Sequence, residues 1–319
     1  MISGMVGPNL ASWGVEVAAV AGTPSSMDEF NELADEWGAA GRYADYRELV
    51  ADPGVDTVYV AVPNFLHYAV SEAAILAGKD VVCEKPLASN EVEAARLAAL
   101  AKEHARFLWE AVVTTRQPNF KLVRDELLPK IGTVKAVSVN YSQYSSRYDA
   151  FRAGEVLPAF DPAKAGGAIM DIGLYTLTCT IGLFGEPKSA RYHANIERGI
   201  DTSGLVVLEY DGFTATNVCA KDSWGATGAT IQGTDGWIRT DTGANLCGPV
   251  TFCLNGGEPE VIDRSLPVMW EGEFREFCRQ QDEGDLAECY RQLDQSLLVS
   301  RVQNTIRREA GVIFPADEA

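Results

Sequence analysis

The first third of the chain alternates short apolar runs with segments of helical periodicity. Residues 15–21, 55–62 and 80–83 are apolar runs of strand length, and amphipathic stretches at 25–37, 68–77 and 89–104 follow them in turn. A helix between two strands makes them parallel neighbours, because the right-handed crossover returns the chain to the same end of the sheet. The pattern predicts an α/β domain of the doubly wound Rossmann type, with helices on both faces of a parallel sheet.

The order of predicted strands and helices changes after Gly132. Strand-like runs now follow one another with turns between them, at residues 134–144, 190–197, 205–210, 213–220, 229–232 and 237–240. Strands without intervening helices favour a mostly antiparallel sheet. Helical patterns interrupt them only at 171–184 and at 270–308, the latter broken around Gly284. We expect a dinucleotide-binding domain at 1–116 and an α+β domain with an open, mostly antiparallel sheet at 117–319, and the last helix is a candidate to pack back on the first domain.

Composition narrows the setting. The 319 residues carry a formal net charge of −18, with a pI of about 4.6, so a nucleic acid or an anionic membrane surface would be repelled. The seven cysteines include no Cys-x-x-Cys pair, which favours reduced thiols over a disulfide framework or a metal site. No signal-like segment opens the chain and no run of about eighteen apolar residues occurs. We expect a cytoplasmic protein that binds neither membrane nor metal.

Polar residues follow two of the predicted parallel strands. The run 55–62 leads into Pro63, Asn64 and His67, and the run 80–83 leads into Glu84-Lys85-Pro86. Ligands of doubly wound sheets bind at the carboxyl ends of the strands, where these residues fall. Each has a simpler explanation, since Asn64 could cap a helix, His67 could be exposed, and Glu84 with Lys85 could be a solvated pair. Their coincidence at two strand ends favours a site.

These residues belong to a longer pattern. The order Ala61-x-Pro63-Asn64-x-x-His67, then Glu84-Lys85-Pro86, then Gly166-Gly167-x-x-x-Asp171-x-Gly173-x-Tyr175 resembles the Gfo/Idh/MocA family, the glucose-fructose oxidoreductase and inositol dehydrogenase group. Tyr175 in place of a histidine resembles the glucose-fructose oxidoreductase and dihydrodiol dehydrogenase branches.

The resemblance implies an enzyme that transfers hydride between NAD(P) and a sugar, polyol, diol or related carbonyl compound. It also implies that Lys85 is catalytic and that the open second sheet forms a homodimer or homotetramer interface.

Hydride transfer to or from a carbinol carbon needs a group that moves a proton at the oxygen. We predict that Tyr175 donates the proton, that Lys85 polarises the oxygen and tunes the pKa, and that Asp171 orients the substrate. Partial burial would lower the pKa of Lys85 itself, which Glu84 would oppose if it pointed the same way. Asp171 and Tyr175 are four residues apart on a predicted helix and so share a face. Tyr175 as a core aromatic residue and Asp171 as a helix cap are the simpler alternatives. Gly166, Gly167 and Gly173 would allow close backbone approach to a ligand.

The start of the chain departs from the family pattern. The expected Gly-x-Gly-x-x-[Gly/Ala] loop would end near Ile2-Ser3, with Ser3 in the third-glycine place, so the first strand and two glycines are missing from the sequence given. Either the start was assigned too far downstream, or the chain lacks the central strand. We favour the first explanation, because the second would expose the edges of neighbouring strands. Gly4 and Gly7 could alternatively form a makeshift loop, but no strand-like run precedes them.

The cofactor preference rests on the turn after residues 15–21. This turn reads Gly-Thr-Pro-Ser-Ser and offers no acid to the ribose hydroxyls before Asp28, which tilts the expectation toward NADP over NAD, with Thr23 nearest the 2′ position. A turn of small residues is the plain alternative. The predicted cofactor-binding residues are Ile2, Thr23, Ala61, Pro63, Asn64, His67, Glu84 and Lys85.

The substrate signals are weaker. Residues 141–148 combine hydroxyl groups with Arg147, which suits a polyhydroxylated or anionic ligand, but an ordinary amphipathic strand and turn is the favoured interpretation. Arg116 is left out of the predicted site. A non-catalytic dinucleotide-binding sensor or co-regulator of the same fold is the alternative function. Lys85, Asp171 and Tyr175 argue against it, because a sensor has no need of an acid/base set.

Overall fold

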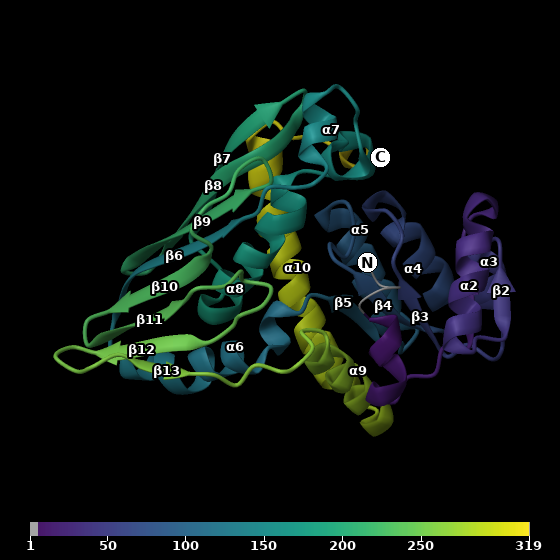
Figure 1. Cartoon of the computed structure of the whole chain (residues 1–319), viewed down its shortest axis with the longest axis horizontal. Helices are drawn as coiled ribbons and strands as arrows, with labels where there is room; N and C mark the ends of the chain where they lie inside the picture. Colours follow the sequence, from purple (N-terminus) through teal and green to yellow (C-terminus); the bar gives the residue numbers. More distant parts are fainter. Residues whose placement is uncertain (1–5, 319) are drawn as a thin grey trace.

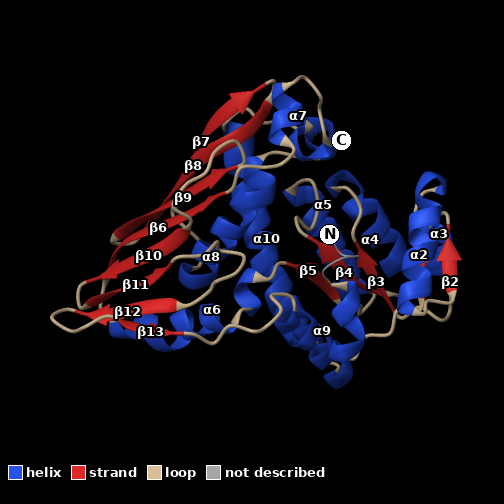
Figure 2. Ribbon diagram, viewed as in Figure 1, coloured by secondary structure: helices blue, strands red, loops and turns tan. Residues whose placement is uncertain are grey.

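The computed structural model describes residues 6–318 and shows two domains joined by a long helix. Figure 1 places the first domain on the right and the large second-domain sheet on the left, with the helix α10 (Leu286–Glu309) running between them. Figure 2 shows the same division, with short strands among helices on one side and long strands on the other.

The first domain has the predicted parallel arrangement. Strands β3 (Thr57–Val60), β4 (Asp80–Glu84) and β5 (Leu108–Ala111) form one parallel sheet in the order β3-β4-β5. Strands β1 (Ala19–Ala21) and β2 (Gly41–Tyr43) form a separate parallel pair. The doubly wound prediction is confirmed, although its strands are divided into two sheets.

Helices cover both faces of the three-stranded sheet. The helices α2 (Met27–Trp37), α3 (Tyr46–Ala51), α4 (His67–Leu76) and α5 (Glu91–Glu103) alternate with the strands along the chain. Val81 of β4 packs into a core with Ile75 of α4 and Leu97 of α5, all fully buried. On the other face, Trp13 and Tyr59 both stack on Phe274, with ring centroids 5.2 Å and 5.7 Å away.

The first strand, β1, is shorter than the sequence predicted. The described part of the chain opens with the 3₁₀ helix η1 (Gly7–Trp13), and β1 begins at Ala19 instead of residue 15. Gly14 ends η1 with φ +85°, a conformation that favours glycine. The predicted remnant of the glycine loop at Ile2 and Ser3 lies outside the described residues.

The second domain is built on an eight-stranded sheet. Its order is β13-β12-β11-β10-β6-β9-β8-β7, and every neighbouring pair is antiparallel except β6 and β9. The bounds are β6 Val134–Ser142, β7 Ser189–Glu197, β8 Ile200–Tyr210, β9 Phe213–Ala220, β10 Gly228–Gly233, β11 Gly236–Thr240, β12 Val250–Leu254 and β13 Glu260–Ile262. The predicted mostly antiparallel sheet is confirmed.

One face of this sheet is covered by helices and the other is open. The covering elements are α6 (Pro118–Leu122), α8 (Leu174–Phe184) and the second half of α10, and the short helix α7 (Tyr148–Arg152) lies beyond one end. The segment Pro162–Phe184 is apolar enough to suggest a membrane span, with a mean hydropathy of 1.4 in its most apolar window, but 72% of that window is buried inside the protein. It is therefore a core segment of this fold.

The C-terminal helical region bends where the sequence indicated. The helix α9 (Glu271–Glu283) ends at Gly284, which has φ +68°, and α10 begins two residues later. Leu293 of α10 belongs to the core of the first domain, and Val299 and Ile306 belong to the core of the second. Since one rigid helix contributes to both cores, it fixes the two domains relative to each other.

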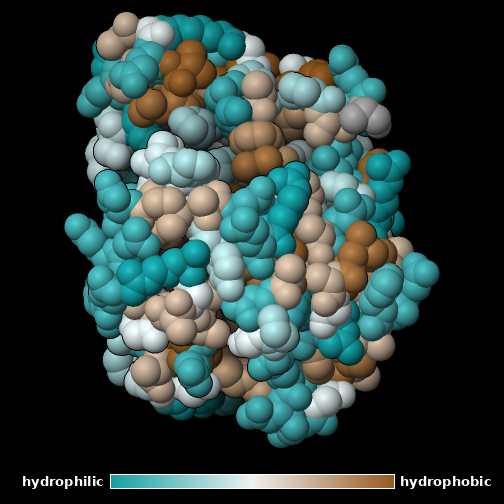
Figure 3. Space-filling model, turned by 90° about the vertical axis from the view of Figure 1, so that its right-hand side faces the viewer, coloured by the Kyte–Doolittle hydropathy of each residue, from teal (hydrophilic) through white to brown (hydrophobic). Residues whose placement is uncertain are grey.

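The end of the chain reinforces that connection. The Arg307 guanidinium forms a bidentate ion pair with Asp317, at 2.7 Å and 2.8 Å, and both side chains are almost fully buried. The Asn90 amide of the first domain donates to the Ala316 carbonyl over 2.6 Å. The tail is thus clamped to α10 and to the first domain. Figure 3 shows the face on the first-domain side, where hydrophobic patches are small and separated by hydrophilic surface.

We expect Asp317→Asn to lower the free energy of unfolding by about 3–5 kcal/mol, because it leaves the buried Arg307 charge without its partner. The matched control is Glu186→Gln at the exposed Glu186–Arg301 pair, for which a loss of at most about 1 kcal/mol is expected. Urea denaturation of both variants measures the difference. Equal losses in the two variants would show that the buried pair does not stabilise the tail.

Candidate active site

The Glu84-Lys85-Pro86 turn is held from several sides. Glu84 ends β4 and accepts a hydrogen bond from the Tyr59 hydroxyl of β3 at 2.7 Å and one from the Lys85 backbone N–H at 3.3 Å. The Lys85–Pro86 peptide bond is cis. Behind the turn, the buried Glu110 carboxylate of β5 accepts the Leu87 N–H at 2.9 Å. These contacts leave the Lys85 side chain free to extend away from the sheet.

His67 joins the two loops that follow β3 and β4. Its Nδ1 lies 2.7 Å from the Pro86 carbonyl oxygen and its Nε2 lies 2.8 Å from the Val62 carbonyl oxygen. Burial lowers the pKa of the His67 imidazole, although both carbonyls oppose that shift. Since both ring nitrogens are engaged by the protein, any contribution of His67 to cofactor binding is through the shape of these loops.

The loop after β3 also reaches the second domain. The Asn64 amide donates to the Ala165 carbonyl oxygen at 2.9 Å, and the Lys164 ammonium lies 4.0 Å from the centroid of the Phe65 ring. Ala61 and Pro63 are exposed at the start of the same loop. The predicted cofactor-binding residues at this strand end therefore lie at the junction of the domains.

The two glycines at 166 and 167 serve packing within the protein. A Cβ at Gly166 would lie 2.5 Å from the Pro158 carbonyl oxygen, and one at Gly167, whose φ is +107°, would lie 2.2 Å from the Asp201 carboxylate. The expectation that they admit a ligand finds no support, because protein atoms occupy that space. Gly173 is similar, with the Ile169 side chain 2.8 Å from its Cβ position.

Lys85 meets a carboxylate that a second lysine shares. The Lys85 Nζ lies 2.6 Å from Asp171 Oδ1, and the Lys221 Nζ lies 2.8 Å from Asp171 Oδ2. The two lysine side chains are 9% and 4% exposed, whereas the Asp171 side chain is 41% exposed. Both oxygens of Asp171 are bound by lysines, so this carboxylate orients Lys85, and its predicted role in orienting the substrate stays a prediction. We call these three residues the lysine–aspartate triad.

Tyr175 completes the group. Asp171 lies in the π-helical turn η9 (Ile169–Gly173) and Tyr175 follows in the first turn of α8, so both side chains come to Lys85. The Lys85 Nζ lies 4.7 Å from the centroid of the Tyr175 ring. The centroid of the Tyr141 ring of β6 lies 6.0 Å from the same Tyr175 centroid. Within residues 6–318 the Tyr175 hydroxyl has no hydrogen-bond partner, which leaves it available to a substrate oxygen.

The charges of the triad compensate one another. Burial alone would lower the pKa of Lys85, but Asp171 and Tyr175 raise it, and the net shift is well upward. Burial would raise the pKa of Asp171, but Lys85 and Lys221 hold it well below its ordinary value. Burial raises the pKa of the Tyr175 hydroxyl against the opposing effect of Lys85. The expectation of a lowered Lys85 pKa is therefore wrong, and the carboxylate is the reason.

The predicted ribose end of a cofactor site lies elsewhere on the first domain. Thr23 follows β1 and its hydroxyl lies 2.9 Å from the Ser25 hydroxyl and 3.0 Å from the Ser26 hydroxyl. This exposed hydroxyl cluster suits the ribose end, and the loops after β3 and β4 suit the nicotinamide end. At Gly7 the Trp37 ring fills the space that a Cβ would occupy, so this glycine is required for packing within the protein. Ile2 lies outside the described residues, as does the rest of the predicted glycine loop.

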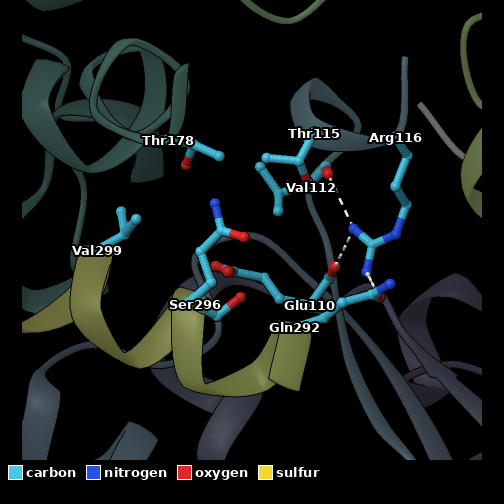
Figure 4. Close-up of a pocket in the computed structure, with 9 residues that line it drawn as sticks. Glu110, Val112, Thr115, Arg116, Thr178, Gln292, Ser296 and Val299 are labelled. Carbon is cyan, nitrogen blue, oxygen red and sulfur yellow. Dashed lines mark hydrogen bonds between the residues drawn. The ribbon is translucent and has the colours of Figure 1, made fainter. Parts of the chain in front are cut away.

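A small cavity lies behind the site. It holds about 20 Å³ and lies between β5, α8 and α10. Figure 4 shows the Arg116 guanidinium at its edge, where it donates to the carbonyl oxygens of Glu110 and Val112 and to Gln292. The two terminal nitrogens of Arg116 are thus engaged by protein acceptors, and leaving Arg116 out of the site stays a prediction.

Lys221 is the residue that sequence reasoning missed. It directly follows β9, and a single lysine after a β-run carries no signal of its own. Only the strand order of the folded sheet brings the end of β9 beside η9.

Within residues 6–318, the structure has no group of three or more His, Cys, Asp or Glu that could hold a metal ion.

Comparisons with known proteins agree with the geometry. Residues 9–112 match the family model described as an oxidoreductase family with an NAD-binding Rossmann fold, and residues 129–239 match the GFO/IDH/MocA C-terminal domain. The chain is 38% identical over 297 residues to scyllo-inositol 2-dehydrogenase (NADP(+)) IolU of Bacillus subtilis (strain 168), covering 92% of this chain and 90% of that protein.

More distant relatives extend the picture. Trans-1,2-dihydrobenzene-1,2-diol dehydrogenase of Homo sapiens is 28% identical over 317 residues, covering 95% of this chain and 91% of that protein. The crystal structure of a 3-ketoreductase from Actinomadura kijaniata in complex with NADP has a TM-score of 0.81 at 21% identity, covering 98% of this chain and 95% of that one. The last comparison concerns the fold alone. The chain belongs to the Gfo/Idh/MocA family and is an NAD(P)-dependent oxidoreductase.

Proposed function

We propose that this protein reduces the carbonyl group of a polyhydroxylated or diol-related compound with NADPH, and oxidises the corresponding alcohol in reverse. The observation that supports the proposal is the lysine–aspartate triad beside the unpaired Tyr175 hydroxyl. The raised pKa values of Lys85 and Tyr175 keep both groups protonated at neutral pH, and carbonyl reduction needs them in this form. The relatives named as an inositol and a diol dehydrogenase support this substrate class.

The protein residues divide the work between charge and proton. NADPH, when bound, supplies the hydride that reaches the carbonyl carbon. The Lys85 ammonium donates a hydrogen bond to the carbonyl oxygen and stabilises the negative charge that develops there. The Tyr175 hydroxyl delivers the proton that completes the new alcohol, so one hydride and one proton are added to the C=O bond. Asp171 holds Lys85 in place for this task.

The preference for NADP rests on the turn after β1. An NAD enzyme presents an acid to the ribose hydroxyls, whereas here Thr23, Ser25 and Ser26 present only hydroxyls. A 2′-phosphate could accept hydrogen bonds from such a cluster. Relatives named as NADP(+) enzymes support the same preference.

Assembly and location are also part of the proposal. The face of the eight-stranded sheet opposite its helices carries residues such as Arg191, Ser138 and Val261, which are exposed in the single chain. We place a homodimer or homotetramer contact on this face. A cytoplasmic location fits the seven cysteines, all of which are free.

A non-catalytic sensor of the same fold is the competing function. A sensor would bind the dinucleotide without turnover and would place no demand on Lys85 or Tyr175. Incubation with NADPH and a panel of ketoses, inosose and dicarbonyl compounds distinguishes the two, because only the enzyme consumes NADPH. Binding of NADPH without any consumption would overturn the proposed function.

We expect Lys85→Met to lower kcat by a factor on the order of 1,000 and Tyr175→Phe by a factor of about 100–10,000, since each removes a group that acts in the transition state. KM should change much less, because the substrate keeps its other contacts. Steady-state kinetics of NADPH consumption measure both variants, with Tyr68→Phe as the control, which removes a partly buried hydrogen bond to Glu72. An unchanged kcat in Lys85→Met would reject the mechanism.

The two directions should respond differently to pH. Alcohol oxidation needs a group that can accept a proton, and the raised pKa values of Tyr175 and Lys85 keep both protonated through neutral pH. The kcat/KM of oxidation should therefore rise about tenfold per pH unit between about pH 7 and 9, while that of reduction stays flat. Initial rates in both directions over this range test the expectation. A plateau of the oxidation rate near neutral pH would contradict it.

Thr23→Asp should reverse the cofactor preference. The new carboxylate would repel the 2′-phosphate of NADPH and accept hydrogen bonds from the ribose hydroxyls of NADH. We expect the Kd for NADPH to rise by a factor of about 10–100, corresponding to about 1.4–2.8 kcal/mol, and the Kd for NADH to fall or stay constant. Calorimetric titration measures both, with Thr23→Val as the uncharged control. Parallel changes for both cofactors would place the 2′ position elsewhere.

A further inference from the structure

Lys221 occupies a buried position behind Asp171. It lies immediately after β9, and its side chain is only 4% exposed. Its Nζ lies 2.8 Å from Asp171 Oδ2, 3.3 Å from the Ala159 carbonyl oxygen, and 4.9 Å from the Phe160 ring centroid. The ammonium is therefore surrounded by protein groups.

The position of Lys221 is fixed by its backbone as well. Its N–H donates to the Thr202 carbonyl oxygen of β8 at 2.9 Å, and its own carbonyl oxygen accepts the Ser145 N–H at 2.8 Å. Both partners belong to segments of the central sheet or its immediate extension. A buried lysine held this firmly carries a cost of desolvation that its carboxylate partner must offset.

We propose that Lys221 is a positioning residue of the reaction, which holds the Asp171 carboxylate in the orientation that fixes the Lys85 ammonium. This inference rests on the proposed function. With Oδ2 bound to Lys221, the other oxygen, Oδ1, is directed at Lys85, so the two lysines and the carboxylate have one arrangement. Lys221 also leaves the triad with one net positive charge, which favours the developing oxyanion of the substrate.

A direct role for Lys221 in binding substrate is disfavoured by its surroundings. Asp171 is ten times more exposed than Lys221, at 41% against 4% of the side chain, so the carboxylate separates Lys221 from the solvent side. The contacts of the Lys221 ammonium are all made within the protein. It acts on the reaction through Asp171.

Other charged or titratable groups face the triad from neighbouring elements. They must be considered in any pH profile, because their electrostatic effects reach Lys85, Tyr175 or the Asp201 carboxylate near Lys221. Burial raises the pKa of Asp201, which Lys221 and several hydrogen bonds oppose. The groups are Glu84 at the end of β4, Glu110 on β5, Tyr141 on β6, Tyr175 on α8 and Asp201 on β8.

The test compares Lys221→Met with Lys221→Arg in NADPH consumption assays. We expect Lys221→Met to lower kcat on the order of 100-fold with little change in KM, because Lys85 is then misplaced. Lys221→Met removes one of the two ammonium groups beside Asp171, so the pKa of this carboxyl should return toward its ordinary value. The pH below which kcat falls should therefore rise by about 1–3 pH units. Lys221→Arg keeps the charge and should restore much of kcat and the original acid limb. Lys188→Met, at an exposed lysine beside β7, is the control.

A double-mutant cycle guards against a loss that is merely structural. If Lys221 acts through Asp171, then Lys221→Met should lower kcat no further in an Asp171→Asn background, where its partner carboxylate is already gone. Additive losses would overturn the inference, as would a rise in KM at constant kcat, which marks a substrate-binding lysine. Should Lys221→Met not fold, Lys221→Gln enters the same cycle.

The outcomes also separate this inference from the proposed function. A wild-type protein that consumes no NADPH with any carbonyl compound overturns the proposed function and, with it, the role of Lys221. A wild-type enzyme whose kcat and acid limb are unchanged by Lys221→Met overturns the inference alone.

Discussion

The lysine–aspartate triad is the constraint on which the rest of the site depends. Lys85 comes from the first domain, whereas Asp171 and Lys221 come from the second, so the Lys85–Asp171 ion pair crosses the domain junction. Two largely buried ammonium groups are stable only beside a carboxylate, and a carboxylate between two cations stays ionised. Any shift of one domain against the other would leave at least one of these charges without its partner. The site therefore requires a fixed domain arrangement.

The fold meets this requirement through elements far from the chemistry. The helix α10 contributes Leu293 to one core and Val299 to the other, and the tail after it is clamped by the Arg307–Asp317 pair. Within the first domain, His67 joins the loops that follow β3 and β4, and it thereby fixes the turn that carries Lys85. These contacts orient Lys85 from within the protein. They show how a motif residue such as His67 can be buried and still shape the proposed site through the loops that it joins.

Sequence reasoning recovered the features that arise from local pattern. The break at Gly284, the parallel and antiparallel halves and the turn at Lys85 each follow from periodicity, glycine or proline placed within a few residues. It did not recover Lys221, because the partner of that lysine is fifty residues away along the chain and only the sheet order brings them together. The glycines at 166 and 167 show the same limit. Their function depends on Pro158 and Asp201, which local pattern cannot identify as neighbours.

The reversal of the Lys85 pKa expectation shows how a counter-ion changes the chemistry of a buried lysine. Desolvation taken alone lowers a lysine pKa and would make Lys85 a base at neutral pH. With Asp171 at 2.6 Å the shift is upward, so Lys85 stays protonated at neutral pH. A protonated Lys85 can stabilise an oxyanion, which is the role proposed for it, with Tyr175 proposed as the proton donor. The Asp171 carboxylate thus supports the proposed division of roles, and Lys221, bound to its second oxygen, is proposed to hold that carboxylate in place.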